Sequence, residues 1–182
     1  MNISDCFIEG LKVIEPAVFP DSRGYFFEAY SSAKLAVQGI NFDFVQDNQS
    51  RSSYGVIRGL HFQIPPYAQT KLVRVLEGSI IDVAVDIRSG SSTYGQHFAI
   101  ELSAENRKQL LIPAGFAHGF SVLTEFATLL YKCDQFYSKE SERGILYNDV
   151  NLNIDWKVPV DTAIVSEKDQ HLPAFATIEK YF

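Results

Sequence analysis

The chain has 182 residues, 46% apolar side chains and a formal net charge of −6, which suits one domain, residues 1–182, that buries about 70% of its unfolded surface. The negative charge and the lack of any long basic run argue against general binding to nucleic acids or to membrane surfaces. The chain shows neither a signal-peptide pattern nor an apolar run of about 20 residues, and Cys6 and Cys133 make a poor disulfide framework, so we expect a cytoplasmic protein with unpaired thiols.

The N-terminal part predicts short strands and one helix. Residues 7–19 alternate as one or two strands broken by Pro16, residues 21–24 form a turn, and residues 25–30 continue as a strand. Ser31 as N-cap and Gly39 near the end predict a short helix over residues 31–41. Abundant Phe and Tyr, with Gly and Pro spread along the chain, favour an all-β fold whose few short helices lie mainly near the termini.

The central part predicts a strand, a loop and a hairpin. Residues 42–46 alternate as a strand, and the polar run at residues 47–55 is predicted to be a loop. Two apolar strands flank Glu77–Gly78 within residues 71–88, which is a hairpin signal. Asp82 and Asp86 share one face of the second strand, and this spacing is typical of a solvent-exposed face.

Further strands are predicted at residues 97–102, 109–112, 119–123 and 127–134, separated by polar turns. Short strands at such regular spacing favour a β-sandwich or jelly roll. The tail over residues 148–182 has ambiguous apolar spacing. His97 and His171 belong to no motif, so we expect structural or exposed roles for both.

Two segments carry the side chains of a candidate site. His61 follows an apolar run that includes Arg58, and a turn with two prolines separates His61 from Lys71. A strand pair can aim these three side chains at one place, which predicts a site for an anionic ligand. The second segment, residues 113–118, has the form P-x-G-x-x-H and ends at His118.

The second segment resembles the second motif of the cupin superfamily, whose members are antiparallel jelly-roll barrels with the site inside. Metal-binding cupins use two histidines and a glutamate from their first motif. Here Gln63 takes the place of one histidine and Lys71 that of the glutamate. An ammonium has no lone pair for a metal ion, so we expect a cupin-type jelly-roll barrel without a metal or another cofactor.

Seven runs occur in an order that resembles the dTDP-4-dehydrorhamnose 3,5-epimerase family over roughly residues 5–175. They are D-x-R-G-x-F-x-E (21–28), Q-D-N-x-S (46–50), G-V-I-R-G-L-H-F-Q (55–63), D-V-A-V-D-I-R (82–88), P-x-G-F-A-H-G-F (113–120), Y-K (131–132) and S-E-K-D (166–169). The resemblance implies epimerisation of dTDP-4-dehydro-6-deoxy-D-glucose to dTDP-4-dehydro-L-rhamnose, in dTDP-L-rhamnose biosynthesis, by proton transfer next to the C4 ketone.

The resemblance also implies the catalytic roles. His61 matches the family's base, Asp169 the carboxylate that holds it, Lys71 the cation for the enolate oxygen, and Tyr131 the acid. Histidine suits a base near neutral pH, and a tyrosine hydroxyl keeps its proton there. A fixed cation in a dry barrel stabilises the developing negative charge.

Binding residues carry over in the same way. The resemblance implies that Arg23, Arg58 and Lys168 bind the diphosphate. The residues that it implies for the deoxythymidine are Glu28, Gln46, Asp47 and Asn48. Phe26 and Tyr137 are aromatic residues suited to flank the base or the sugar, and His118 and Glu142 also line the site. The family implies a homodimer in which part of the N-terminal region, residues 23–28, crosses to the neighbour's site.

Three alternatives stay open at this point. An epimerase acting at only one carbon of a related dTDP-4-keto-6-deoxyhexose would share these motifs. A metal-dependent cupin oxygenase or isomerase would need a ligand set that is incomplete here. A non-catalytic cupin that binds nucleotide sugars would have no need of a base, an opposed acid and an enolate cation together.

Overall fold

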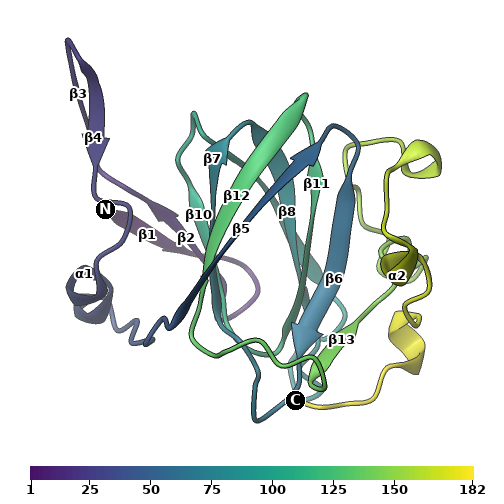
Figure 1. The fold of residues 1–182 in the computed structure, drawn as a ribbon. Coiled ribbons are helices and arrows are strands. Elements are labelled where there is room, and N and C mark those ends of the chain that lie inside the picture. The colour runs from purple at the N-terminus through teal and green to yellow at the C-terminus, as the bar shows by residue number, and fades with distance from the viewer.

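The computed structural model describes residues 1–182 as two facing antiparallel sheets, a projecting hairpin and a few short helices (Figure 1). One sheet has six strands in the order β1 (Asn2–Asp5), β2 (Lys12–Glu15), β10 (Gln109–Ile112), β7 (Lys71–Glu77), β12 (Phe126–Cys133) and β5 (Gln46–Ser53). The other has five, in the order β13 (Glu142–Gly144), β6 (Ile57–Gln63), β11 (Phe116–Val122), β8 (Ser79–Asp86) and β9 (His97–Ser103). The remaining elements are the hairpin of β3 (Val18–Asp21) and β4 (Gly24–Phe27), the helices α1 (Ser32–Val37) and α2 (Glu167–Gln170), and the 3-10 turns η1 (Val160–Thr162) and η2 (Phe175–Thr177).

Alternation along the strands divides the apolar side chains between the barrel interior and its outer faces. On β8, Ile80 and Ala84 belong to the core between the sheets, whereas Val83 and Val85 pack on the opposite face. Both faces of β8 are covered, and all of its residues are buried. This double burial explains why apolar residues occur on both faces of the strand.

Two outer layers hold the sheets. The C-terminal segment covers the outer face of the five-stranded sheet (Figure 1), with Trp156 fully buried beneath it. The indole Nε1 of Trp156 donates a hydrogen bond to the Tyr147 carbonyl at 2.8 Å. On the six-stranded sheet, α1 packs Leu35 against Ile14 and Leu72. These layers fix the strands that carry the predicted site residues.

The predicted all-β fold with few short helices is confirmed, and most predicted strands are present. The N-cap is as predicted, because the Ser31 hydroxyl accepts a hydrogen bond from the Lys34 amide. The helix ends at Val37, earlier than predicted, and Gly39 follows with a φ of +75°. Strand β1 is not among the predicted strands. No helix combines the length and apolar character that crossing a bilayer requires.

The predicted strand at residues 42–46 and loop at residues 47–55 are wrong. Strand β5 runs Gln46–Ser53 and pairs with β12 along its whole length. Every second side chain, beginning with Gln46, is less exposed than its neighbours, so β5 has an inward and an outward face. The inward residues are polar because they face a polar cavity, and β5 is the edge strand of its sheet.

The predicted hairpin around Gly78 is also wrong, because β7 and β8 belong to different sheets and do not pair. Gly78 makes the chain pass sharply from one sheet to the other with a φ of +76°. A Cβ at this position would lie 2.2 Å from the Phe126 carbonyl oxygen, so only glycine fits. The strands were predictable, but their assignment to two sheets was not.

The expectation that Asp82 and Asp86 face solvent is contradicted, since both are 0% exposed. Both carboxylates point to the inward face of β8. Asp86 accepts hydrogen bonds from Arg88, Ser91 and Thr93, so it fixes the loop that follows the strand. Asp82 has a different partner, described below.

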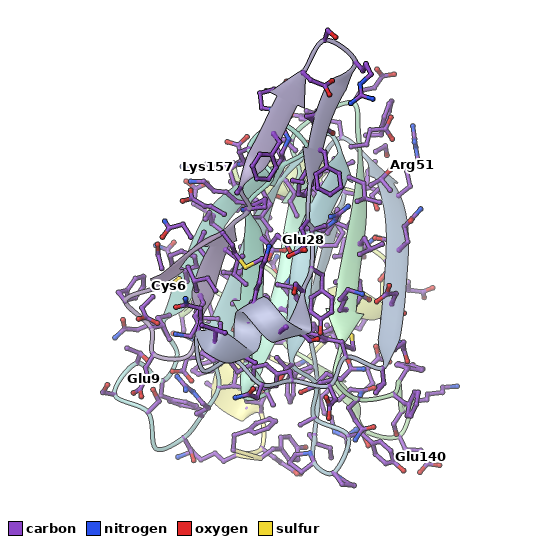
Figure 2. All side chains as sticks on the ribbon, turned by 90° about the vertical axis from the view of Figure 1, so that its left-hand side faces the viewer. Cys6, Glu9, Glu28, Arg51, Glu140 and Lys157 are labelled. Carbon is purple, nitrogen blue, oxygen red and sulfur yellow. The ribbon has the colours of Figure 1, made fainter.

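The hairpin of β3 and β4 projects away from the barrel, and both figures show it beyond the body of the sheets (Figures 1 and 2). Phe19, Tyr25 and Phe26 on this hairpin are 60%, 57% and 68% exposed. A cluster of exposed aromatic side chains on an extended hairpin is typical of a surface that contacts another chain.

Candidate active site

A cavity of about 470 Å³ lies inside the barrel and is lined by both sheets and the C-terminal segment. Seven of the fifteen predicted site residues meet in it, namely Arg58, His61, Lys71, His118, Tyr131, Lys168 and Asp169. An adjoining cavity of about 370 Å³ is lined by Gln46, Asn48, Tyr137 and Glu142. The side chains of His61, Lys71 and Tyr131 line both cavities. A ligand with two parts could fill both cavities and meet these three side chains where the cavities join.

An irregularity in β6 places both Arg58 and His61 at the cavity, although strict alternation would send them to opposite faces. The pairing of β6 with β11 shifts register at this point. Gly59 permits the shift, because its φ is +114° and an added Cβ would lie 2.6 Å from the Gly119 Cα. Leu60 therefore packs on the outer face, and His61 turns inward.

His61 forms a hydrogen-bonded pair with Asp169, with 2.7 Å between Nε2 and Oδ1. The carboxylate is 3% exposed, and its Oδ2 accepts the Gly59 amide at 3.1 Å. Ser166 caps the turn by accepting the Asp169 amide. Burial raises the pKa of Asp169, but the hydrogen bond from His61 and the other donors hold that pKa below its ordinary value. An ionised carboxylate only accepts, so Nε2 carries the hydrogen and Nδ1 is left for a ligand.

Tyr131 and Lys71 project from neighbouring strands, β12 and β7, of the six-stranded sheet. His61 lies on the facing sheet. Burial raises the pKa of the Tyr131 phenol, so it keeps its proton at neutral pH. Burial lowers the pKa of the Lys71 ammonium, while charges nearby, including the carboxylates of Asp82 and Glu142, act in the opposite direction.

Two cations border the cavities. The Nε of Arg58 donates to the Ser52 hydroxyl at 3.0 Å, which orients the guanidinium and leaves its terminal nitrogens for a ligand. Lys168 forms an ion pair with Glu142 at 2.6 Å, and the Tyr137 hydroxyl donates to Glu142 at 3.1 Å. Burial raises the pKa of Glu142, but the hydrogen bonds from Lys168 and Tyr137 outweigh burial and lower it. Guanidinium and ammonium groups suit the oxygens of a diphosphate.

Strand β5 directs Gln46 and Asn48 into the second cavity. Gln46 donates to the Asn48 side chain at 3.0 Å and accepts the Tyr137 amide at 3.1 Å. Asp47 points the other way, because its side chain is 54% exposed and pairs with Lys132. The structure therefore does not bring the predicted Asp47 side chain into the site, since consecutive residues of a strand face opposite sides.

Three predicted binding residues lie on the hairpin or directly after it, outside both cavities. The Arg23 side chain is 87% exposed and pairs with Asp21, and Phe26 is also exposed. Glu28 pairs with Lys34 of α1 at 2.8 Å, and Figure 2 shows it between the hairpin and α1. One chain by itself therefore does not bring Arg23, Phe26 and Glu28 to its own site.

His118 has a partner that the sequence did not predict. Its Nε2 bonds Asp82 Oδ1 at 2.7 Å inside the barrel. The available signal was an aspartate within a strand that carries apolar residues on both faces, which indicates burial rather than exposure. His97 and His171 lie outside both cavities, and Cys6 and Cys133 are unpaired, as predicted. No three His, Cys, Asp or Glu side chains form a group that could hold a metal ion.

Comparisons with known proteins identify the family. The family model described as dTDP-4-dehydrorhamnose 3,5-epimerase matches residues 5–177. A curated dTDP-4-dehydrorhamnose 3,5-epimerase from Pseudomonas aeruginosa is 53% identical over 177 residues, which are 97% of each chain.

Solved structures give the same result. The chain is similar to the crystal structure of dTDP-4-dehydrorhamnose 3,5-epimerase from Elizabethkingia anophelis, with a TM-score of 0.93, 52% identity, and coverage of 100% of this chain and 99% of that one. It is also similar to the dTDP-6-deoxy-D-glucose-3,5-epimerase of Legionella pneumophila in complex with dTDP-4-keto-L-rhamnose, with a TM-score of 0.93, 46% identity, and coverage of 98% and 94%. The family model, the sequence identity to the Pseudomonas aeruginosa relative and the shared fold show that this chain belongs to the dTDP-4-dehydrorhamnose 3,5-epimerase family.

Proposed function

We propose that this chain epimerises dTDP-4-dehydro-6-deoxy-D-glucose at C3 and C5 to give dTDP-4-dehydro-L-rhamnose. The observation that carries this proposal is the placement of His61 and Tyr131 on facing sheets, with Lys71 lining the same two cavities. A base, an opposed acid and a cation are the three groups that inversion next to a ketone requires.

His61 removes the proton. Its Nδ1 is free because Nε2–H is held by Asp169, and the hydrogen on C3 or C5 is acidic because the carbanion is conjugated with the C4 ketone. As His61 becomes an imidazolium, the buried Asp169 stabilises the new charge and keeps the ring in one orientation. The Gly59 amide and the Ser166 cap hold that carboxylate in place.

Lys71 stabilises the enolate oxygen that forms at C4. Its ammonium enters the site from the sheet opposite His61 and next to Tyr131. A single preorganised donor to a developing oxyanion is worth about 3 kcal/mol in other enzymes. The carboxylates of Asp82 and Glu142 favour the charged form of Lys71 against the effect of burial on its pKa.

Tyr131 returns a proton to the opposite face of the sugar carbon. It keeps this proton at neutral pH because burial raises the pKa of its phenol. His61, on one sheet, removes a proton from one face of the carbon, and Tyr131, on the facing sheet, delivers a proton to the other face. The two steps together invert the configuration of the carbon. Delivery from the same side would restore the original configuration.

The nucleotide holds the substrate while the sugar reacts. Arg58 and Lys168 supply cations for the diphosphate, and the side-chain amides of Gln46 and Asn48 supply donors and acceptors for the thymine. Tyr137 is half exposed at the mouth of the second cavity, where its ring can stack on the base. Glu142 and His118 complete the wall.

Arg23, Phe26 and Glu28 act in the partner's site of a homodimer. They lie outside the cavities of their own chain, on an extended hairpin that exposes aromatic side chains. An arm that crosses to a second copy would bury these rings and add a cation to the neighbour's diphosphate site. The unpaired thiols of Cys6 and Cys133 fit a reducing compartment, which supports a cytoplasmic location.

The test is incubation of the protein with dTDP-4-dehydro-6-deoxy-D-glucose in deuterated water, followed by NMR of the sugar. We expect deuterium at both C3 and C5 and inversion at both carbons. Exchange confined to one carbon would identify a single-centre epimerase instead. A ligand that binds without any exchange would identify a nucleotide-sugar-binding protein.

A further inference from the structure

Asp82 carries a buried carboxylate that the reaction above uses only as a distant charge. It lies on the inward face of β8 between Ile80 and Ala84 of the central core and is 0% exposed. Its Oδ1 bonds His118 Nε2 at 2.7 Å, and its Oδ2 has no hydrogen-bond partner. Burial of a carboxylate with one hydrogen bond is unfavourable, and folds keep such groups mainly where a site needs them.

Asp86 on the same face of the same strand shows what a structural carboxylate looks like in this chain. Both of its oxygens accept hydrogen bonds, from Arg88, Ser91 and Thr93, and these bonds fix the loop after β8. Asp82 fixes no loop and bonds no backbone amide. Its one partner is a histidine that lines the cavity.

His118 occupies a position that mirrors His61. The two residues lie opposite each other in the pairing of β11 with β6, and each has a buried carboxylate 2.7 Å from its Nε2. An ionised carboxylate accepts the hydrogen of Nε2, so Nδ1 is the nitrogen of His118 that a ligand meets. Burial lowers the pKa of Lys71 and the charge of Asp82 opposes this effect, so Asp82 acts on that cation as well.

We propose that Asp82 is a positioning residue for the epimerisation: it fixes the ring of His118 so that Nδ1 bonds an oxygen of the sugar while the enolate forms. This inference rests on the proposed function. The orientation of His118 needs a group that only accepts from Nε2, and a carboxylate is such a group. An amide in the same place could accept or donate, and would let both ring orientations and both tautomers occur.

The experiment compares wild type with Asp82→Asn, which keeps the shape of the side chain. We expect kcat for dTDP-4-dehydro-6-deoxy-D-glucose to fall on the order of 10- to 100-fold, as for carboxylates that orient metal-binding histidines. The Kd for dTDP should stay within about twofold, because Asp82 lines neither cavity. The chain has four histidines, so ¹⁵N-histidine NMR can follow each ring, with His118→Gln assigning one set of signals. The His118 signals should change and those of His61 should not.

Asp149→Asn is the matched control. Asp149 is another buried aspartate, 5% exposed, but it bonds the backbone amides of Asn151, Leu152 and Phe175 and lines neither cavity. We expect lower thermal stability in this variant with unchanged kcat. If Asp82→Asn does not fold, Asp82→Ser is measured in the same way.

An unchanged kcat together with unchanged His118 signals in the Asp82 variant would overturn the inference. The inference would also be overturned if the Asp82 and Asp149 variants lost kcat in the same proportion to their loss of thermal stability. A purely structural role of Asp82 predicts that result. Inactive wild type would overturn the proposed function itself, and with it this inference, before any variant is compared.

Discussion

The imidazole of His61 and the hydroxyl of Tyr131 enter one cavity from facing sheets, His61 on β6 and Tyr131 on β12. This relationship separates the two halves of an inversion. In the proposed reaction, His61 takes the proton from one face of the sugar, and Tyr131 returns a proton to the opposite face. Proton removal and proton delivery can therefore each be abolished by a separate substitution.

Tyr131→Phe should stop inversion while exchange continues. The change removes one proton donor and almost no volume, so His61 still takes a proton and hands back deuterium on the original face. Inverted product should fall by about 10²–10⁴, the range for one acid or base group. NMR in deuterated water reads exchange and configuration separately. Tyr54→Phe is the control, because Tyr54 is exposed and lies outside both cavities. Normal inversion in Tyr131→Phe would assign the acid role to another group.

His61→Ala should abolish deuterium exchange at both carbons. Binding of dTDP should stay close to wild type, because affinity comes from the nucleotide and the base acts on the sugar. Asp169→Asn should give a smaller but large loss, since it removes the carboxylate that orients His61 and stabilises its charged form. His171→Ala changes a histidine outside both cavities and should have no effect. Exchange at either carbon at the wild-type rate in His61→Ala would require a second base.

Arg58→Ala should weaken dTDP binding by roughly tenfold to a hundredfold, because a guanidinium on a diphosphate gives charge-assisted bonds of about 1.5–3 kcal/mol. Calorimetry with dTDP, which lacks the reacting deoxyhexose, isolates the contribution of Arg58 to nucleotide binding. Arg51→Ala is the matched control, because Arg51 points away from the barrel (Figure 2) and pairs with Glu77 at 2.7 Å. Equal affinities for the two variants would place Arg58 outside the site.

Mixed dimers test the role of the hairpin. Arg23→Ala leaves the barrel intact but removes the cation that the arm would supply, and His61→Ala leaves the arm intact but removes the base. Each variant alone should be weakly active or inactive. Co-refolded mixtures should regain activity, because a mixed dimer has one intact barrel that receives one intact arm. If mixing restores nothing while a stable mixed dimer forms, the arm does not act in the partner's site.

Asp86 should contribute to stability in a pH-dependent way. Burial raises the pKa of Asp86, but hydrogen bonds from Arg88, Ser91 and Thr93 outweigh burial and hold that pKa at about 2. A folded pKa below the unfolded value stabilises the protein above about pH 4, by about 2 kcal/mol, and the contribution is lost as pH falls towards 2. Urea unfolding of Asp86→Asn should therefore show a deficit at pH 7 that narrows below pH 4. Asp43→Asn, at an exposed position, should lose little unfolding free energy at any pH. A loss of unfolding free energy in Asp86→Asn that stays constant with pH would indicate that Asp86 acts through packing rather than charge.

The sequence by itself determined the strands, the order of the motifs and the identity of His61, Lys71, Tyr131 and Asp169 as candidate residues. Local apolar alternation predicts a strand wherever one face meets a core, and it located most strands of both sheets. A motif also needs no tertiary information, because its residue types and spacing are present in the sequence. The assignment of the chain to its family follows from the same information.

Only the tertiary structure decided which polar residues face the cavity. Strand β5 escaped prediction because its polar side chains face a polar cavity, and no local pattern distinguishes that cavity from solvent. The register shift at Gly59 places Arg58 and His61 together, and it depends on how closely β11 approaches. Asp82 was misread because its spacing indicates one exposed face, whereas β8 is covered on both faces by distant segments. Burial depends on contacts between residues far apart in the chain, so it becomes known only when the sheets are assembled.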